Sequence, residues 1–336
     1  MAFRFIQVLA LASAVSGALA DKYTRTKPDQ GALVVDATGA TAGSYPNIGA
    51  AVGALHNLTS AQKIYIMPGV YNEQVYIAPH AGPITIQGYT KNARGYKDNQ
   101  VTITNNFSRQ MPEIPNNDLT ATFRLNTTNV RLYNLNIANT AGQFRQNGQA
   151  LAISAQKTNQ GFYGCQFTGY QDTILANNGR QIYAKSFVNG AVDFIFGQRA
   201  IAWFDKIDIQ TIGPGYITAN GRDAENNTSI YVFNQVNVSG TNGTNTTVLG
   251  RPWRAFSRVI FQNSYLSDVV KPEGWARWDN TQSTDDIVYQ EYKNYGPGAD
   301  ITARANFSSQ AVAPIKASDL FGAGFEKESW VDTNYL

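Results

Sequence analysis

Two glutamines and two aspartates are spaced so that a coiled chain could bring them together. The step along the chain from Gln149 to Gln171 is nearly the same as the step from Asp172 to Asp193. If the chain coils with this period of about 20 residues, the four residues lie on successive turns, and neighbouring parallel strands are about 4.8 Å apart. Two carboxyl groups and two side-chain amides would then converge, although nothing in the linear sequence pairs them.

Two carboxyl groups this close cannot both ionise cheaply, so the pKa of one of them rises. At mildly acidic pH the pair would hold one carboxylate and one carboxylic acid, which can serve as nucleophile and general acid. Arg251 could hold one aspartate ionised, and the amides of Gln149 and Gln171 could donate to an oxyanion. The alternative is that both aspartates are solvated turn residues, as most aspartates are.

Metal binding and other nucleophiles are weaker alternatives. Calcium needs about six to eight oxygen ligands, whereas the neighbours here would be two amides and the cation of Arg251. His56 and His80 are the only histidines, so neither a His/Cys metal site nor a Cys–His pair is expected. No Gly-x-Ser-x-Gly motif is present, which argues against a serine hydrolase. We expect no metal and no cofactor, and we predict that Cys165 is a buried thiol.

The elements that must position these residues are short β-rich runs that repeat. Runs with an aromatic residue near their start, followed by mostly polar or small residues and another apolar residue, are Leu132–Ile137, Phe162–Phe167, Ile182–Phe187 and Ile260–Tyr265, continued less cleanly by Ala202–Phe204 and Tyr231–Phe233. In this alignment Tyr163 corresponds to Tyr183 in the next run. A period of about 20 residues with several short strands per unit indicates an all-β protein, a parallel β-solenoid whose stacked coils close the core.

Other segments are predicted to cap the solenoid or project from it. Ile48–Leu58 has alanine and leucine at helical spacing and is predicted to cap the N-terminal end of the core. Residues 105–128 and 211–247 are rich in Asn, Thr, Gly and Pro, and are predicted to be projecting loops, where binding residues tend to lie. The tail from Ser308 to Leu336 has weak helical character and is expected to pack back along the solenoid.

Residues 1–20 have the features of a secretory signal peptide. Arg4 supplies a positive charge, residues 5–15 are largely apolar, and residues 18–20 place small residues at the cleavage-determining positions. The apolar run is too short to cross a bilayer. We therefore expect residues 21–336 to form one secreted domain without a membrane partner. Asn-x-Ser/Thr sequons between Asn57 and Asn306 predict a glycoprotein.

The composition suits a folded protein with a sizeable core, with 43% hydrophobic and 15% charged residues. A net charge of +3 from 27 basic and 24 acidic residues gives no reason to expect nucleic acid as a partner. This mild positive balance is compatible with an anionic polymer as substrate. The single cysteine excludes an intramolecular disulfide, so stability must come from burial. We expect a monomer.

Five motifs resemble the pectin methylesterase family in their order and spacing. They are Gly69–Glu73, Gly148–Ala150, Gly169–Thr173, Asp193–Gly197 and Leu249–Trp253. The resemblance covers roughly residues 30–330, and the sequons and lack of disulfides are more similar to the fungal branch than to the plant branch. It implies a right-handed parallel β-helix that removes methyl esters from homogalacturonan, the backbone of pectin, and releases methanol.

The resemblance also implies a role for each polar residue. Asp193 matches the nucleophile that attacks the ester carbonyl. Asp172 matches the residue that protonates the departing methanol and then deprotonates the water that hydrolyses the acyl-enzyme. Gln149 and Gln171 match the positions that stabilise the tetrahedral oxyanion. Arg251 matches the residue that orients the ionised nucleophile.

Sugar rings bind to flat apolar faces, which aromatic side chains can provide. The aromatic candidates for a substrate groove are Phe196, Trp253 and Trp278, followed by Tyr170 and Trp275. Thr122 loosely matches a substrate-contacting threonine of the family. Phe194 is interpreted as a core residue, and the motif Gly69–Glu73 is interpreted as structural.

Two other functions remain open at this point. One is a pectin-active β-helix that cleaves the polymer chain, either a glycosidase, which places carboxyl groups across a glycosidic bond, or a lyase. The other is a wall protein that binds polysaccharide without catalysis. Falling viscosity without methanol would indicate the first, and binding without either product would indicate the second.

Overall fold

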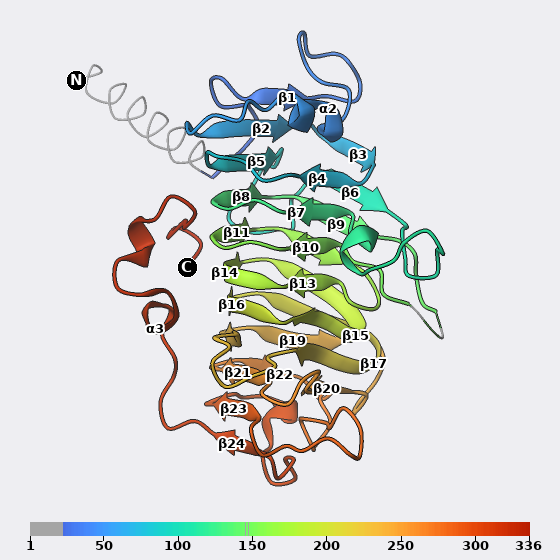
Figure 1. The fold of residues 1–336 in the computed structure, drawn as a ribbon, viewed down its shortest axis with the longest axis vertical. Helices are drawn as coiled ribbons and strands as arrows, with labels where there is room; N and C mark the ends of the chain where they lie inside the picture. Colours follow the sequence, from blue (N-terminus) through green and yellow to red (C-terminus); the bar gives the residue numbers. More distant parts are fainter. Residues whose placement is uncertain (1–22, 145, 147) are drawn as a thin grey trace, which may run out of the picture.

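The chain winds into a stack of coils built from parallel strands (Figure 1). The computed structural model describes residues 23–144, 146 and 148–336, so the predicted signal peptide lies outside the described residues. The strands form an 11-stranded sheet and a 13-stranded sheet. The second sheet folds into two halves that share the long strands β15 and β17, so each central coil has three sides. This arrangement is the predicted parallel β-helix.

The 11-stranded sheet contains β1 (Leu33–Val35), β2 (Gln62–Ile66), β5 (Ile84–Gly88), β8 (Val130–Tyr133), β11 (Gln160–Tyr163), β14 (Asn178–Ala184), β16 (Arg199–Asp205), β18 (Ile230–Asn234), β21 (Arg258–Gln262), β23 (Val288–Tyr292) and β24 (Ser308–Gln310). The first half of the other sheet contains β3 (Gly69–Asn72), β6 (Val101–Asn105), β9 (Asn136–Asn139), β12 (Gln166–Thr168), β19 (Asn237–Gly240) and β22 (Tyr265–Leu266). Its second half contains β4 (Val75–Ile77), β7 (Phe123–Leu125), β10 (Ile153–Ala155), β13 (Ile174–Ala176) and β20 (Thr247–Gly250), and the shared strands are β15 (Phe187–Gly197) and β17 (Asp208–Asn220).

A short helix closes the N-terminal end of the coil, as predicted. Helix α2 (Ile48–Gly53) buries Ile48 and Ala51 against the first coils. The Glu73 carboxylate accepts the backbone N–H groups of Ile48 and Gly49, both at 2.8 Å, which supports the structural interpretation of the motif that contains it. The helix ends earlier than predicted, and the chain after it is held by Gln62, whose side chain bonds both backbone groups of His56.

The interior contains a column of aromatic rings from successive coils. The rings of Phe162, Tyr183, Phe204, Phe233 and Phe261 stack with neighbouring centroids 4.3–4.6 Å apart. Aromatic pairs of this kind contribute about 0.5–1.5 kcal/mol each beyond the area they bury. Because each ring stacks on the next, the column also fixes the alignment of one coil on another.

The register of this column corrects the repeat alignment made from the sequence. That alignment placed Tyr183 opposite Tyr163, whereas the structure pairs Tyr183 with Phe162, and Tyr163 with Ala184. A shift of one residue reverses the direction of a strand side chain. Tyr183 therefore lies in the core, whereas Tyr163 lies on the outer surface of the sheet.

The C-terminal tail covers that outer surface, as expected, and is red in Figure 1. It contains the short helix α3 (Ala317–Phe321) and the 3-10 helix η3 (Phe325–Lys327). The Tyr163 hydroxyl donates to the Trp330 carbonyl at 2.8 Å, and Arg180 forms two hydrogen bonds to Glu328. The tail is thus held by buried apolar contacts and by the ion pair between Arg180 and Glu328.

The two predicted loop regions have different outcomes. Residues 105–128 are mostly irregular, with the 3-10 helix η1 (Asp118–Thr120) and strand β7 near their end. The prediction for residues 211–247 is wrong, because most of β17 and all of β18 and β19 lie there. Buried residues such as Ile217 and Val238 make these strands part of the core. Their pattern was masked by the Asn- and Gly-rich turns between them.

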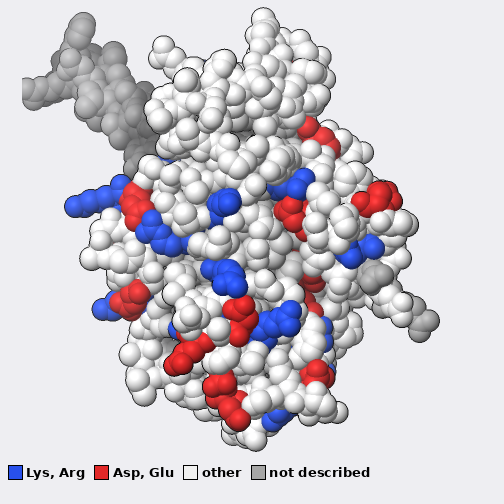
Figure 2. All heavy atoms as spheres, viewed as in Figure 1, with Lys and Arg blue, Asp and Glu red and all other residues white. Residues whose placement is uncertain are grey.

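The described residues carry mixed surface charges on the face drawn in Figure 2 and contain no helix that could cross a membrane. Figure 2 shows Lys and Arg interspersed with Asp and Glu on the face that it presents, without one dominant patch of either sign. No helix of the described chain is long and apolar enough to cross a membrane. Cys165 is buried, as predicted, and burial raises the pKa of its thiol to about 12.

A buried ion pair stabilises the C-terminal coils. Arg304 donates from Nε to Glu291 Oε1 at 2.7 Å, and the two side chains are 6% and 2% exposed. Further N–H groups of Arg304 bond the carbonyls of Pro272 and Gly298. Removing one member of such a pair leaves the other charge buried without compensation.

We expect Arg304→Leu to lower the free energy of unfolding by about 3–5 kcal/mol, because it leaves Glu291 buried and unpaired. The measurement is urea unfolding of the variant and the wild type. The matched control is Arg199→Leu in the pair with Asp223, whose side chains are 59% and 43% exposed and whose loss should cost about 0–1 kcal/mol. Equal losses in the two variants would contradict this account of the buried pair.

Candidate active site

The predicted ladder of polar residues is present at one corner of the coil. Gln149 pairs with Gln171 in a parallel bridge, and Gln171 pairs with Val192 on the following coil. The backbone N–H of Asp172 donates to the Val192 carbonyl at 3.1 Å. Asp172 and Asp193 therefore occupy equivalent positions on adjacent coils, one residue beyond the bridge.

Both aspartates have a left-handed backbone conformation, with φ of 65° at Asp172 and 51° at Asp193. This region is unfavourable for most residues, although aspartate enters it more readily than most. Asp172 lies two residues before β13, and Asp193 lies inside β15, where its pairing with β17 shifts register between Val192 and Ile195. The strain is thus located at the two residues whose carboxyl groups share one pocket.

The pocket contains all five polar residues predicted for the site. Its volume is about 220 Å³, and its lining residues are Asn117, Gln149, Gln171, Asp172, Asp193, Phe196, Ala219, Arg251, Trp253 and Trp278. A larger cavity of about 420 Å³ lies between the N-terminal segment and the C-terminal tail, but its lining includes one carboxyl group, that of Asp332. The convergence of paired carboxyls, amides and a guanidinium favours the smaller pocket as the site of chemistry.

Arg251 holds Asp193 by a two-point contact. Its Nε donates to Oδ1 at 2.9 Å, and a terminal nitrogen donates to Oδ2 at 2.6 Å. The guanidinium carbon lies 4.0 Å from the ring centroid of Tyr216 and 4.1 Å from that of Trp278. These rings restrict the guanidinium, so the direction of the Asp193 carboxylate is fixed with it.

The two carboxyl groups are in different electrostatic environments. Burial raises the pKa of Asp172 well above its ordinary range, the neighbouring Asp193 raises it further, and Arg251 partly opposes both. Burial also raises the pKa of Asp193, but there the hydrogen bonds and charge of Arg251 act directly against it. Because, within the described residues, the guanidinium bonds Asp193 and not Asp172, the environment favours the proton of the pair on Asp172 and the negative charge on Asp193.

The two glutamines offer their amides to the pocket. Within the described residues, neither side chain has a hydrogen-bonding partner in the protein. Gly148 makes room for one of them, because a Cβ at this position would lie 2.7 Å from Gln171 Oε1. Free amide N–H groups beside two carboxyls can donate to an oxygen that gains negative charge.

Apolar side chains form the floor and rim of the same pocket. Phe196, Leu175 and Ala219 are buried in one cluster on the outward side of β13, β15 and β17, and Trp253 and Trp278 pack partly buried against it. The ring centroids of Phe196 and Trp253 are 6.1 Å apart. Three of the five predicted aromatic residues thus line the pocket. Phe194 faces the core, as predicted.

Two predicted substrate contacts are contradicted by the structure. Trp275 is 2% exposed and stacks on Tyr289 inside the coil at 4.2 Å, because it continues the parallel ladder beside Gly250 with its side chain inward. Thr122 is fully buried, and its hydroxyl donates to the Ala138 carbonyl. Tyr170 is partly exposed and does not line the pocket, and its contact with substrate stays a prediction.

Two residues of the site were not predicted from the sequence. Asn117 comes from the loop before β7, and its amide donates to Asp172 Oδ2 at 3.0 Å. Tyr216 lies on β17 in register with Val192 and covers one face of Arg251. The only signals in the sequence were the two predicted projecting regions, residues 105–128, which contain Asn117, and residues 211–247, which contain Tyr216 although the latter form strands. No group of three His, Cys, Asp or Glu residues in the described chain could hold a metal ion.

The fold and the site define a parallel β-helix protein with a paired-aspartate pocket on its surface. The sequence matches the Pectinesterase family over residues 33–325. It is 44% identical to a pectinesterase of Aspergillus aculeatus and to one of Aspergillus niger, covering 97% of this chain and 98% of each relative. The chain therefore belongs to the pectinesterase family.

Solved structures agree with this assignment. A crystal structure of the pectin methylesterase from Aspergillus niger superposes with a TM-score of 0.85 at 37% identity, covering 93% of this chain and all of that one. The pectin methylesterase from carrot superposes with a TM-score of 0.79 at 26% identity, covering 90% of this chain and 97% of that one. The similarity thus includes nearly the whole coil.

The raised pKa of Asp172 predicts a stability effect with a definite sign. Between the ordinary carboxyl pKa and the raised one, the folded protein keeps a proton that the unfolded chain has lost, so stability falls as the pH rises through this window. Asp172→Asn removes this pH-dependent loss of stability, because an amide side chain does not titrate. The variant should be more stable than wild type at pH 7, by about 1.4 kcal/mol for each pKa unit, and similar to it near about pH 4.

Urea unfolding at the two pH values measures this difference. The control is Asp223→Asn, because the hydrogen bond from Asn227 lowers the pKa of Asp223. Its substitution should therefore not stabilise the protein at pH 7. A wild type that is at least as stable as Asp172→Asn at pH 7 would contradict a proton held on Asp172.

Proposed function

We propose that this protein removes methyl esters from pectin with Asp193 as nucleophile and Asp172 as general acid and base. The observation that carries the proposal is the asymmetry of the pair. Arg251 bonds one carboxyl at two points and leaves the other with a strongly raised pKa. A carboxylate and a carboxylic acid in one pocket supply the two groups that acyl transfer requires.

In the first step, an Asp193 oxygen attacks the ester carbonyl carbon and the carbonyl electrons move to oxygen. The N–H groups of Gln149 and Gln171 are available to stabilise this oxyanion. When the carbonyl re-forms, the bond to the methoxy oxygen breaks, and Asp172 transfers its proton to that oxygen. Methanol leaves, and the sugar carboxyl is joined to Asp193 as a mixed anhydride.

In the second step, Asp172 is a carboxylate and takes a proton from water while the water oxygen attacks the acyl carbon. A second tetrahedral oxyanion forms in the same place and collapses to the galacturonic acid product. The bond to Asp193 breaks, and Asp172 again carries its proton. Arg251 compensates the charge of Asp193 whenever that carboxylate is free.

The pocket suits a polymer that inserts one group at a time. Its volume of about 220 Å³ is below the range of about 300–1000 Å³ typical for whole small ligands. The aromatic faces of Trp253 and Trp278 border the pocket, where they can contact neighbouring sugar rings. The related fungal proteins are named pectinesterases and pectin methylesterase, which supports methylated homogalacturonan as the substrate.

We further propose that residues 21–336 act as one secreted, monomeric catalytic domain after removal of residues 1–20. The features of residues 1–20 support export. The alternatives raised from the sequence, a chain-cleaving enzyme and a binding protein, receive no support from the relatives, which are named as esterases.

We expect Asp193→Asn to reduce methanol release from methylated pectin by a factor of about 10³ or more, because an amide is a poor nucleophile. Methanol and viscosity are measured together, so that chain cleavage would be seen separately. Asp223→Asn, at an exposed ion pair, is the control and should retain wild-type activity. Equal methanol release by Asp193→Asn and wild type would remove Asp193 from the mechanism.

A further inference from the structure

We propose that Asn117 is a positioning residue that decides which oxygen of Asp172 carries the catalytic proton, and that a polar network centred on Asp118 holds Asn117 in place. The inference rests on the proposed role of Asp172 as general acid and base. It deepens that role by naming the group that orients the acid.

The direct contact is a single hydrogen bond. Asn117 Nδ2 donates to Asp172 Oδ2 at 3.0 Å. Within the described residues, this is the only hydrogen bond to that carboxyl group. Because an amide N–H can only donate, Oδ2 must act as the acceptor. Because the carbonyl oxygen of a neutral acid is a better acceptor than its hydroxyl oxygen, this bond favours the proton on Oδ1, which has no hydrogen bond within the described residues.

The neutral amide of Asn117 is a suitable partner for a carboxyl group that must stay protonated. Asp193 must be ionised, and a cation holds it, whereas Asp172 must keep a proton between turnovers. A second guanidinium at Asp172 would lower the pKa of that carboxyl and remove the proton. A neutral amide orients the group at a much smaller electrostatic cost. Each carboxyl is therefore held by a partner that matches its protonation state.

The backbone around Asn117 is tied to the coil beneath it. Its carbonyl accepts the N–H of Thr120 at 3.0 Å and the hydroxyl of the same residue at 2.8 Å. The Thr120 oxygen in turn accepts the N–H of Leu151 at 3.1 Å. Thr120 is fully buried, so this turn is anchored although it belongs to a long connection.

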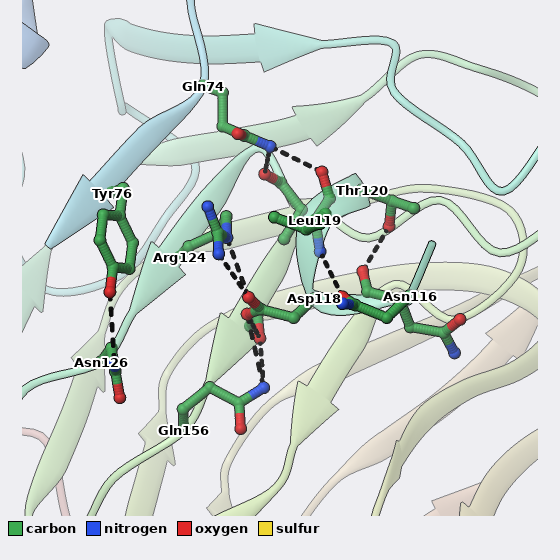
Figure 3. A network of polar contacts seen from close by, with 12 residues as sticks. Gln74, Tyr76, Asn116, Asp118, Leu119, Thr120, Arg124, Asn126 and Gln156 are labelled. Carbon is green, nitrogen blue, oxygen red and sulfur yellow. Dashed lines mark hydrogen bonds and ion pairs between the residues drawn. The ribbon is translucent and has the colours of Figure 1, made fainter. Parts of the chain in front are cut away.

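The Asp118 network fastens the same turn to neighbouring strands (Figure 3). The Asp118 carboxylate accepts two bonds from Arg124, at 3.0 and 2.6 Å, and one from the Ser154 hydroxyl at 2.6 Å. Arg124 and Ser154 are in register on β7 and β10. The Asp118 carboxylate thus ties η1 to two neighbouring coils, at β7 and at β10.

A third coil forms hydrogen bonds to η1 and its C-terminal end, on the side opposite the Asp118 carboxylate. Gln74 Nε2 donates to the carbonyls of Leu119 and Ala121, both at 2.9 Å, and Figure 3 shows it bonding η1 opposite Asp118. Arg124 also lies 4.6 Å from the ring centroid of Tyr76 on β4. With three coils holding η1, the Asn117 amide is placed before substrate arrives.

The charged groups that act on Asp172 are few. They are Asp193 on β15, which raises its pKa, and Arg251 after β20, which lowers it. Asp118 is neutralised by Arg124. A carboxylate introduced at Asn117 would therefore add a third charge next to Asp172 and raise the pKa of Asp172 further.

The first test is Asn117→Ala, assayed by methanol release. We expect kcat to fall about tenfold with KM within about twofold, because a hydrogen bond that orients the acid is lost while substrate contacts remain. The control is Asn136→Ala, which removes an amide that donates to Thr102 on another side of the coil. Its kcat should stay within about twofold of wild type.

The second test is the pH profile of Asn117→Asp, which keeps the side-chain shape. Activity requires a protonated Asp172, so the alkaline limb of kcat should move to higher pH by about one unit. An unmoved limb would show that the side chain at position 117 does not lie against Asp172, and the kcat of Asn117→Ala separately reports whether the native amide orients the acid. Arg124→Gln, which breaks the two-point contact with Asp118, should lower kcat about threefold, and Arg124→Lys should recover part of that loss.

Two outcomes would overturn the proposal. An Asn117→Ala variant with wild-type kcat, together with an unmoved alkaline limb in Asn117→Asp, would show that Asn117 does not orient the acid. If Asp172→Asn is inactive in the same assay, the proposed function survives that result. If Asp172→Asn is fully active, the role of Asp172 is wrong, and the proposed function fails with it.

Discussion

The hydrogen-bond register between neighbouring coils brings the two carboxyl groups of the pocket together. The bond from the Asp172 N–H to the Val192 carbonyl sets one aspartate beside the other, although a full coil of chain separates them. A slip of one residue would turn one carboxyl away from the pocket. The stacked aromatic column in the core, with rings 4.3–4.6 Å apart, makes such a slip costly. The geometry of the pocket and the packing of the core are consequences of the same register.

Within that frame, the two buried carboxyl groups of the pocket are in different electrostatic environments. Arg251 compensates one of them, and burial beside that charge keeps the other protonated. The groups are supplied by different elements, since the aspartates come from the coil corner and Arg251 from the segment after β20. Asn117 comes from a projecting connection. The rigid coil provides the two carboxyl groups of the pocket, and the surrounding segments supply the partners that hold each of them.

Much of the fold could be predicted because its repeat is local. Short β-rich runs at intervals of about 20 residues require a stacked coil, since one coil cannot bury its inner face alone. The assignment of Tyr183 failed because two alignments that differ by a single position look alike in sequence but place a side chain on opposite sides of a strand. The strands within residues 211–247 were missed because the turns between them dominate the composition.

The sequence by itself determined the spacing of the aspartates and glutamines, the motif that carries Arg251, and the family. Tertiary structure alone decided which other side chains reach the pocket. Trp275 resembles a sugar-binding residue but points into the coil, whereas Asn117 and Tyr216 lie in the site without any motif. The reason is physical: the direction of a strand side chain depends on pairing with other coils, and the path of a loop depends on bonds to residues distant in sequence.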